Sequence, residues 1–191
     1  MSYSNITKRA LAAAMKDLMA QRPFAKINVE GICEACGLNR KSFYYHFRDK
    51  YDLVNWIFQT EFIETLQESP TQDEWKMLEQ LCRYFYDNRG FYRAALAIRG
   101  QNSFPEYFRE AITPIVQAAL MGILDQPADA GEQRFEFAAT FYADAFLCAI
   151  IRWLEGRNPA SAEVFSGQIM GCLELGAKHM IADPPATQSM P

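Results

Sequence analysis

A short segment near the N-terminus is dense in side chains that donate hydrogen bonds. Its polar members are Asn39, Arg40, Lys41, Ser42, Tyr44, Tyr45 and His46. Arginine and lysine can pair with guanine in the major groove of DNA, and hydroxyl groups can donate to phosphate oxygens. Phe43 and Phe47 are four residues apart, which places both on the inner face of a helix. The segment therefore predicts a helix that presents Arg40 and Lys41 to base edges.

A second helix and a sharp turn are needed to position that segment. Asn28 predicts the N-cap of a preceding helix, Gly37 predicts the left-handed residue that ends it, and Asn39 predicts the next N-cap. This order is typical of a helix-turn-helix motif. A further helix is predicted to begin at Asp49, and Lys50 and the free amides at its start can bind a phosphate. The alternative interpretation is a basic helical hairpin that enters no groove.

The rest of the chain also indicates helices, and the predicted fold class is all-α. Alternating runs of β-branched residues and Asn-Gly hairpin signals are absent. Apolar spacing, caps and breakers predict helices over about 4–20, 28–37, 39–46, 49–69, 71–87, 91–99, 104–124, 133–154 and 159–181, with a loop at 126–131. Pro114 is expected to kink or split its helix. We predict a three-helix DNA-binding domain at 1–48, a helical-bundle dimerisation and effector domain at 49–183 with the fourth helix as connector, and a loose tail at 184–191.

Charge is distributed unevenly along the chain. Residues 1–50 contain nine Lys and Arg against four Asp and Glu, which gives +5, so a total of −4 leaves −9 for the remainder. Because residues 1–50 are basic and the remainder of the chain (the body) is acidic, only residues 1–50 are predicted to bind a polyanion such as double-stranded DNA. A chance cluster of surface charge is the alternative.

The two helices predicted at the C-terminal end are unusually apolar. Between residues 137 and 153 nearly every helical face carries an apolar side chain, which predicts burial on all sides. Gly167, Gly171 and Gly176 would permit another helix to approach closely. In a chain of this size, both features favour a homodimer whose interface is a four-helix bundle. Two recognition helices related by a two-fold axis require a near-palindromic operator.

Aromatic residues are frequent in the body and allow two interpretations. Stripes of aromatic side chains at helical spacing usually form core, yet they can also line an apolar pocket for a small-molecule effector. The candidates for effector binding are Phe85, Tyr92, Phe108, Tyr142 and Phe146.

Cysteine and histidine give little indication of chemistry. The five cysteines are expected to be reduced and buried, and Cys33-x-x-Cys36 favours packing over zinc or redox chemistry because no second ligand pair accompanies it. His46 is expected to approach phosphate or to cap its helix, and His179 to lie near a helix C-terminus. We predict no metal, no cofactor and no enzymatic activity. The absence of a signal peptide and of a long uncharged apolar run predicts a cytoplasmic protein that does not enter a membrane.

Residues 24–53, FAKINVEGICEACGLNRKSFYYHFRDKYDL, resemble the DNA-binding domain of TetR/AcrR regulators. The shared features are Ile32-Cys33, the Cys36-Gly37 turn, the polar cap Asn39, the stretch Tyr44-Tyr45-His46-Phe47 and Lys50. The resemblance implies contacts with DNA, or support of those contacts, at Asn28, Asn39, Arg40, Lys41, Ser42, Tyr44, Tyr45, His46 and Lys50. It also implies a body that senses a small molecule.

The recognition segment departs from the usual sequence pattern of the family. Lys41-Ser42-Phe43 stands where the family most often has Gly-Thr-Leu, which places the docking on DNA in question. The sequence from Lys41 through Phe58 is similar to that of a subgroup that regulates dihydroxyacetone kinase operons. In this subgroup a TetR-like protein can act as an activator with a partner protein. The alternative function is therefore a co-activator that works through a partner protein and has little DNA affinity alone.

Overall fold

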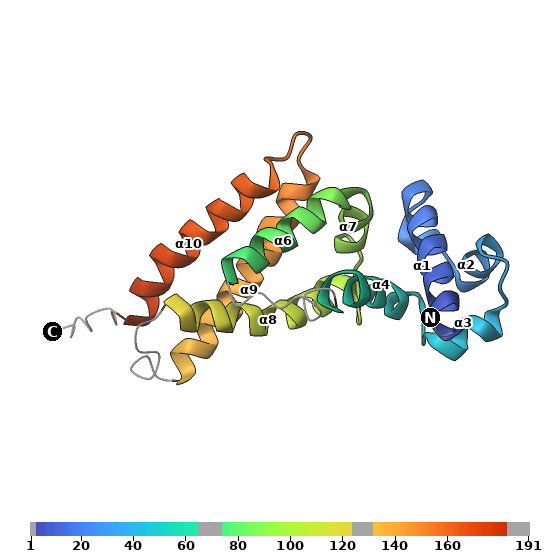
Figure 1. The fold of residues 1–191 in the computed structure, drawn as a ribbon, viewed down its shortest axis with the longest axis horizontal. Helices are drawn as coiled ribbons and strands as arrows, with labels where there is room; N and C mark the ends of the chain where they lie inside the picture. Colours follow the sequence, from blue (N-terminus) through green and yellow to red (C-terminus); the bar gives the residue numbers. More distant parts are fainter. Residues whose placement is uncertain (1–2, 65–73, 124–131, 183–191) are drawn as a thin grey trace. The chain divides into compact units, whose positions relative to one another are not determined.

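The computed structural model describes residues 3–64, 74–123 and 132–182, and within these ranges the secondary structure is helical, without strands. This confirms the predicted all-α class. The elements are α1 (Tyr3–Gln21), η1 (Phe24–Lys26), α2 (Val29–Ala35), α3 (Arg40–His46), α4 (Lys50–Phe58), η2 (Gln59–Ile63), α6 (Glu74–Asp87), α7 (Arg89–Leu96), α8 (Phe104–Ile123), α9 (Glu132–Glu155) and α10 (Ala162–Ala182) (Figure 1).

The chain forms two compact units. One, the N-terminal unit, comprises Met1–Pro70 and Tyr84–Phe108; the other, the C-terminal unit, comprises Thr71–Arg83 and Arg109–Pro191. Helices α6 and α8 each contribute residues to both units. The predicted domain boundary at residue 48 is a functional division and stays a prediction.

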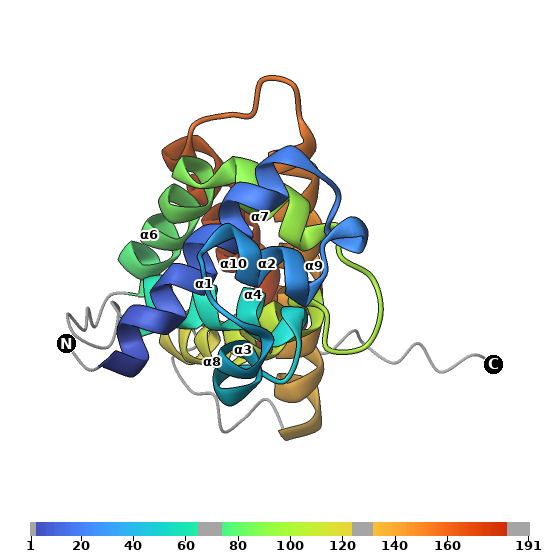
Figure 2. The same cartoon turned by 90° about the vertical axis from the view of Figure 1, so that its right-hand side faces the viewer.

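In the N-terminal unit, α1 packs against α2, α3 and α4. Leu11 and Met15, one helical turn apart on α1, are fully buried, as are Ile32 of α2 and Phe43 of α3. Figure 2 turns this unit so that α2 and α3 face the viewer. The apolar stripe of α1 therefore supplies the surface on which the two shorter helices are held.

Aromatic rings form a second core in the same unit, around Phe58 at the end of α4. The Phe58 side chain is fully buried, and its ring centroid lies 5.5–6.4 Å from those of Phe62, Tyr84, Phe85, Tyr92, Phe104, Tyr107 and Phe108. Three of the predicted effector residues, Phe85, Tyr92 and Phe108, belong to this cluster and are fully buried. Dense ring packing of this kind is core structure.

A chain of hydrogen bonds crosses the edge of that cluster and satisfies its polar atoms. The Tyr92 hydroxyl donates to the Tyr84 oxygen at 2.7 Å, and the Tyr84 hydroxyl donates to Glu61 Oε2 at 2.9 Å. Lys16 Nζ of α1 donates to Glu61 Oε1 at 2.6 Å. Burial raises the pKa of both tyrosines, so their hydroxyls keep the protons that these bonds need.

The C-terminal unit is built from the first part of α6, most of α8, and the neighbouring helices α9 and α10 (Figure 1). The Trp153 and Phe165 rings stack at 4.2 Å where the chain passes from α9 to α10, and Trp153 Nε1 donates to the Ala160 carbonyl at 2.8 Å. The predicted start of the last helix at Asn158-Pro159 is wrong. The helix begins at Ala162, directly after Ser161, whose Oγ accepts from the Val164 amide at 3.4 Å.

Several other expectations meet a definite outcome. Pro114 does not split its helix, since α8 is continuous through it. The helix that starts at Asp49 changes to a π-helical turn at Gln59–Ile63. Its predicted stop at residues 69–70, the start signal at 71–73, the loop at 126–131, the tail at 184–191 and the side chain of His179 lie outside the described residues.

The cysteines are only partly buried, contrary to expectation. All five are free thiols. Cys33 and Cys82 are buried and Cys36 is half-buried, whereas Cys148 and Cys172 on the two C-terminal helices are exposed. Burial raises the pKa of Cys82 to about 12, which keeps that thiol protonated.

One described helix, α9, is long and apolar enough to cross a membrane by length and composition alone, with 39% of its most apolar window buried in the chain. Core helices of soluble proteins pass the same test. The exposed apolar side chains on α9 include Phe137, which is 64% exposed, and Phe141. The single chain therefore leaves part of this helix uncovered.

Candidate nucleic-acid interface

The first helix of the motif begins where the sequence predicts it. Asn28 is extended and its side-chain oxygen accepts from the Gly31 amide at 2.8 Å, so Asn28 is the N-cap of α2. Ile32 and Cys33 are buried on the inner face of α2. The helix is thereby fixed at its start by a cap and along its length by packing.

The turn between α2 and α3 depends on Gly37. This residue has φ +68°, a conformation that side chains disfavour, although a Cβ there would meet no atom within 4 Å. The amide of Leu38 donates back to the Cys33 carbonyl at 2.9 Å, which closes the end of α2. Glycine is therefore needed here for its backbone conformation and not for space.

The recognition helix α3 is capped by Asn39, whose side-chain oxygen accepts from the Ser42 amide at 2.8 Å and from Ser42 Oγ at 3.1 Å. The inner face holds Phe43 and Phe47, which are buried and 5.7 Å apart between ring centroids. Phe47 also meets the Trp56 ring of α4 edge-on at 5.6 Å. These contacts fix the rotation of α3 about its axis and decide which side chains face outward.

The outward face of α3 carries Arg40, Lys41, Tyr44 and Tyr45, all of which are exposed. Tyr45 is 81% exposed and Tyr44 is 52% exposed, which is unusual for aromatic side chains of this size. Ser42 and His46 are half-buried at the margins of this face. Two cations and two phenols on one short helix are suited to base edges and phosphates.

Arg40 and Tyr44, one turn apart, act as a pair. The guanidinium carbon lies 6.0 Å from the centre of the Tyr44 ring, and hydrogen bonding to Tyr44 raises the pKa of Arg40 above its usual value. This contact limits the rotamers of Arg40 and so orients its donors before any ligand is bound.

The structure brings four of the predicted DNA-binding residues around one hollow of about 480 Å³. They are Asn28, Arg40, Tyr44 and Lys50. Lys41, Tyr45 and His46 belong to the adjoining surface of α3 and do not line the hollow. Asn28, Arg40, Tyr44 and Lys50 therefore share one hollow over α3 and the starts of α2 and α4.

Lys50 has structural partners that the sequence did not reveal. Its ammonium donates to the carbonyls of Phe24 at 2.8 Å and Ile27 at 2.7 Å, and lies 4.3 Å from the centre of the Phe24 ring. Burial lowers the pKa of Lys50. In this structure Lys50 positions the segment that leads into α2, and its contact with DNA stays a prediction.

His46 and Lys8 meet at the other margin of α3. Burial and the nearby charge of Lys8 lower the pKa of His46, which favours a neutral imidazole, and its contact with phosphate stays a prediction. Lys8 Nζ of α1 lies 5.6 Å from the Trp56 ring and 6.0 Å from the Phe47 ring. No local pattern selects Lys8, because the residues it contacts are about forty positions away along the chain.

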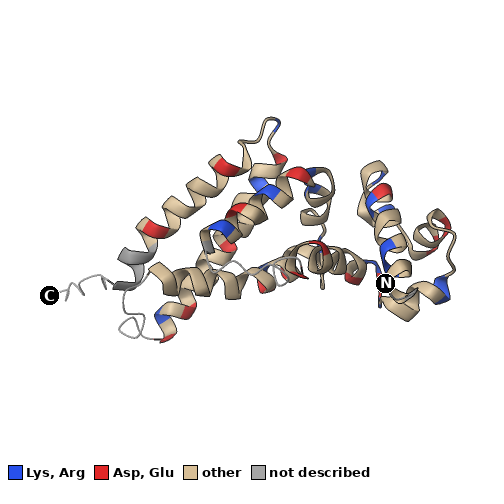
Figure 3. Ribbon diagram, viewed as in Figure 1, with Lys and Arg blue, Asp and Glu red and all other residues tan. Residues whose placement is uncertain are grey.

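Basic residues are visible on α1 and at the start of α3, while α2 carries the acidic Glu30 and Glu34 (Figure 3). The positive charge of residues 1–50 is therefore carried partly by the recognition helix itself. Its placement favours approach of a polyanion to α3.

The cap of α3 gives a first test. Asn39→Ala removes the oxygen that accepts from the Ser42 amide, and we expect it to lower the free energy of unfolding by about 1 kcal/mol. Asn39→Asp keeps a capping oxygen and is the matched control, with a loss of less than half that amount. Urea denaturation measures both. Equal stability of the alanine variant and the native chain would contradict the assigned cap.

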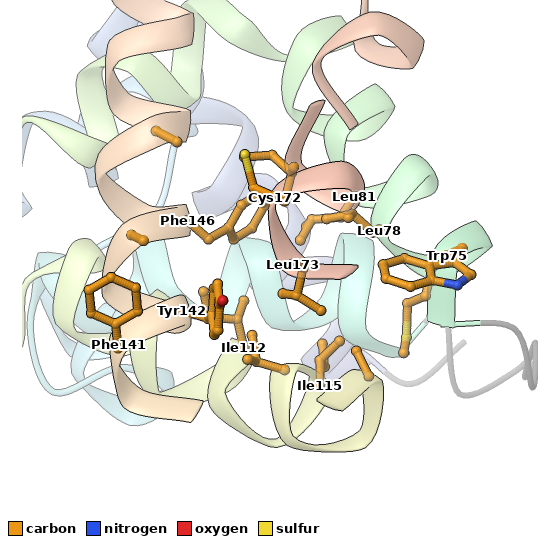
Figure 4. Close-up of a pocket in the computed structure, with 16 residues that line it drawn as sticks. Trp75, Leu78, Leu81, Ile112, Ile115, Phe141, Tyr142, Phe146, Cys172 and Leu173 are labelled. Atoms are coloured by element: carbon orange, nitrogen blue, oxygen red, sulfur yellow. The ribbon is translucent and has the colours of Figure 1, made fainter. Parts of the chain in front are cut away.

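The remaining predicted effector residues, Tyr142 and Phe146 of α9, lie in the C-terminal unit and line a cavity of about 300 Å³ (Figure 4). Phe85, Tyr92 and Phe108 do not line it, because they fill the aromatic core described above. The predicted set is thus divided between core and cavity. The cavity residues that the sequence did not single out include Trp75, Leu78, Ile112 and Cys172.

Among the described residues, no group of three or more His, Cys, Asp and Glu side chains is placed to hold a metal ion. The Cys36 thiol donates to the Ile32 carbonyl at 3.3 Å, which is a packing contact at the end of α2. Burial raises the pKa of both Cys33 and Cys36, and this disfavours the thiolates that zinc or redox chemistry requires.

Comparisons with known families cover most of the chain. Residues 8–57 match the family described as "Bacterial regulatory proteins, tetR family", and residues 73–174 match the one described as "Transcriptional regulator C-terminal region". The second match alone spans more than half of the 191 residues.

Individual relatives agree with these matches. The HTH-type dhaKLM operon transcriptional activator DhaS of Lactococcus lactis subsp. lactis (strain IL1403) is 28% identical over 156 residues, covering 80% of this chain and 81% of that protein. A solved structure of the dihydroxyacetone kinase operon activator DhaS superposes with a TM-score of 0.65 at 24% identity, over 91% of this chain and 97% of that one. A TetR regulator from Streptococcus agalactiae 2603V gives 0.70 at 20% identity, over 90% and 95%. The resemblance inferred from residues 24–53 is confirmed.

Proposed function

The chain belongs to the tetR family of bacterial transcriptional regulators, and from this premise we propose that it binds a near-palindromic operator as a homodimer through α3. The observation that carries the proposal is the exposed face of Arg40, Lys41, Tyr44 and Tyr45 on a helix whose rotation is fixed by two buried phenylalanines. Arg40 and Lys41 pair with guanines, while the hydroxyls and His46 meet phosphates. Helices α1 and α4 hold the DNA backbone.

The dimer forms through α9 and α10 of the C-terminal unit. Phe137, Val164 and Leu175 are 64%, 53% and 74% exposed in the single chain. A Cβ added at Gly167 or Gly171 would meet no atom within 4 Å, so both glycines leave open space on α10. Burying these side chains against a second copy removes exposed apolar surface and gives the two-fold symmetry that a palindrome requires.

Charge placed on this face tests the dimer. The variant Phe137→Glu with Leu175→Glu is expected to shift the protein from dimer to monomer in size-exclusion chromatography with light scattering, because each subunit would bury two carboxylates. Glu136→Gln with Glu174→Gln changes exposed neighbours on the same helices and is the control, expected to remain dimeric. A dimer that survives the double glutamate variant would place the interface elsewhere.

An effector acts through the cavity of the C-terminal unit. Helix α6 supplies Leu78 and Leu81 to the cavity lining and carries Tyr84 further along. Tyr84 bonds Glu61, which pairs with Lys16 of α1. A ligand that favours one position of α6 would bias this hydrogen-bonded chain and with it the helix on which α2 and α3 are mounted.

Because one relative is named as a dhaKLM operon activator, a dihydroxyacetone kinase operon is the first target to examine. Activation, as opposed to repression, is the first mode of regulation to test. The alternative of a co-activator with little DNA affinity of its own is not favoured, because the recognition helix keeps two exposed cations. We place the protein in the cytoplasm, where this class of regulator meets DNA, and we assign it no catalytic role.

A gel shift tests the proposal. The DNA is the promoter region flanking the protein's own gene, at two salt concentrations and with excess nonspecific DNA. We expect a shift that survives the competitor and weakens as salt rises, since phosphate contacts release counterions. A shift removed by the competitor would contradict sequence-specific binding.

A further inference from the structure

The cavity of the C-terminal unit has a uniform chemistry. Its sixteen lining residues come from α6, α8, α9 and α10, and none of these described residues carries a charge. Most are aliphatic or aromatic, and Figure 4 shows one oxygen among the drawn side chains, the hydroxyl of Tyr142. A ligand that fills this space loses its hydrogen bonds to water, and the cavity lining offers few hydrogen bonds in their place.

The size of the cavity limits its occupant to a small molecule. Its volume is about 300 Å³, roughly twice that of the ~150 Å³ apolar cavity that holds a single benzene. A compact molecule built on one substituted or two fused rings fits such a space. A helix or a folded segment of a partner protein needs a longer groove.

Tyr142 supplies the one hydroxyl group of the lining; the other side-chain hydrogen-bond donors drawn there are the Trp75 indole nitrogen and the Cys172 sulfur. Tyr142 is half-buried, its hydroxyl has no hydrogen-bond partner in the described part of the chain, and burial raises its pKa so that the phenol stays protonated. Gly176 of α10 makes room for it, because a Cβ added there would overlap the hydroxyl. The hydroxyl therefore packs against α10 at the wall of the cavity, where it is the hydroxyl group nearest to a ligand.

A polyhydroxylated ligand would bind weakly in this cavity. Only one of its hydroxyl groups could pair with Tyr142, and each of the others buried without a partner lowers affinity on the order of tenfold to a hundredfold. A carboxylate or phosphate would meet no compensating cation, since Arg83 and Arg109 of the same unit are not among the lining residues.

We infer that the cavity binds an uncharged, largely apolar molecule that carries a single hydroxyl group, which bonds Tyr142. This inference rests on the proposed effector control and gives the effector a chemical class. It distinguishes the ligand from dihydroxyacetone, the compound named in the description of the similar solved structure DhaS.

Calorimetric titration of the full-length protein tests the inference with three probes: thymol, p-cymene and dihydroxyacetone. Thymol is p-cymene with one added hydroxyl, so the pair isolates the contribution of that group. We expect saturable binding of both, with thymol about tenfold tighter because of one hydrogen bond, and no binding of dihydroxyacetone at millimolar concentration. Tyr142→Phe should leave the affinity for p-cymene unchanged and lower the affinity for thymol to that of p-cymene.

Two filling variants locate the binding. Ala149→Phe on α9 and Ala119→Phe on α8 each project a ring into the cavity, and either one that keeps the native melting temperature should abolish binding of both aromatic probes. Three results would overturn the inference: no binding of either aromatic probe, equal affinity of thymol and p-cymene for the native chain, or dihydroxyacetone binding that a filling variant removes.

The operator gel shift without ligand separates this inference from the proposed function. Specific DNA binding by a protein that takes none of the aromatic probes would refute the ligand class alone. Probe binding by a protein that shifts no operator would refute the proposed function and leave the ligand class supported.

Discussion

Replacing Arg40 and Lys41 together with alanine is expected to lower affinity for the specific operator on the order of a hundredfold. Each cation that pairs with a guanine contributes about 1–3 kcal/mol to discrimination between bases. Both side chains are exposed, so their loss should leave the thermal melt within a degree or two of the native chain. Fluorescence anisotropy on a labelled operator, with circular dichroism for folding, measures the two effects.

Arg99→Ala with Arg157→Ala is the matched control for that variant. It removes the same charge from exposed positions outside the helix-turn-helix, and a small, uniform change in affinity is expected. Operator affinity retained by the Arg40 and Lys41 double variant would refute the assignment of α3 as the base-reading helix. Equal losses in both variants would indicate that only total charge matters.

Phe58→Ala is expected to cost about 3–5 kcal/mol of the free energy of unfolding, the range for a buried phenylalanine. The Phe58 side chain is fully buried and meets seven other rings, so its removal leaves a cavity that the neighbouring rings cannot close. A domain stable by only 5–15 kcal/mol would lose a large part of its margin. Urea denaturation gives the value directly.

Tyr45→Ala serves as the comparison, because it removes an aromatic side chain that is 81% exposed. Its stability should stay within about 0.5 kcal/mol of the native chain, while operator affinity falls. A loss below 1 kcal/mol for Phe58→Ala would show that the aromatic cluster is loosely packed and does not support the helices around it.

Features determined by local sequence could be predicted. Asn28, Asn39 and Asp49 cap their helices as expected, and Gly37 takes the left-handed turn, because each role depends on residues no more than four positions away. The inner face of α3 followed from the spacing of two phenylalanines. These same signals were specific enough to identify the family.

Features determined by tertiary packing could not be predicted from the sequence. Lys50 donates to carbonyls 23 and 26 residues earlier, and no local pattern indicates that pairing. Aromatic residues of the body lie both in the core and at the cavity, so composition could not separate Phe85 and Tyr92 from Tyr142. The start of α10 was missed because Asn-Pro is a common cap, whereas the helix begins after Ser161.

Dimethyl sulfate footprinting on the operator is the most direct test of the central claim that two copies of α3 read the major groove. The reagent methylates guanine N7 in the major groove and adenine N3 in the minor groove. We expect protection of guanines in two half-sites related by a dyad and centred about 10 base pairs, or a multiple of that, apart, with protection lost in the Arg40 and Lys41 double variant. Full occupancy that leaves every guanine N7 reactive would contradict the claim.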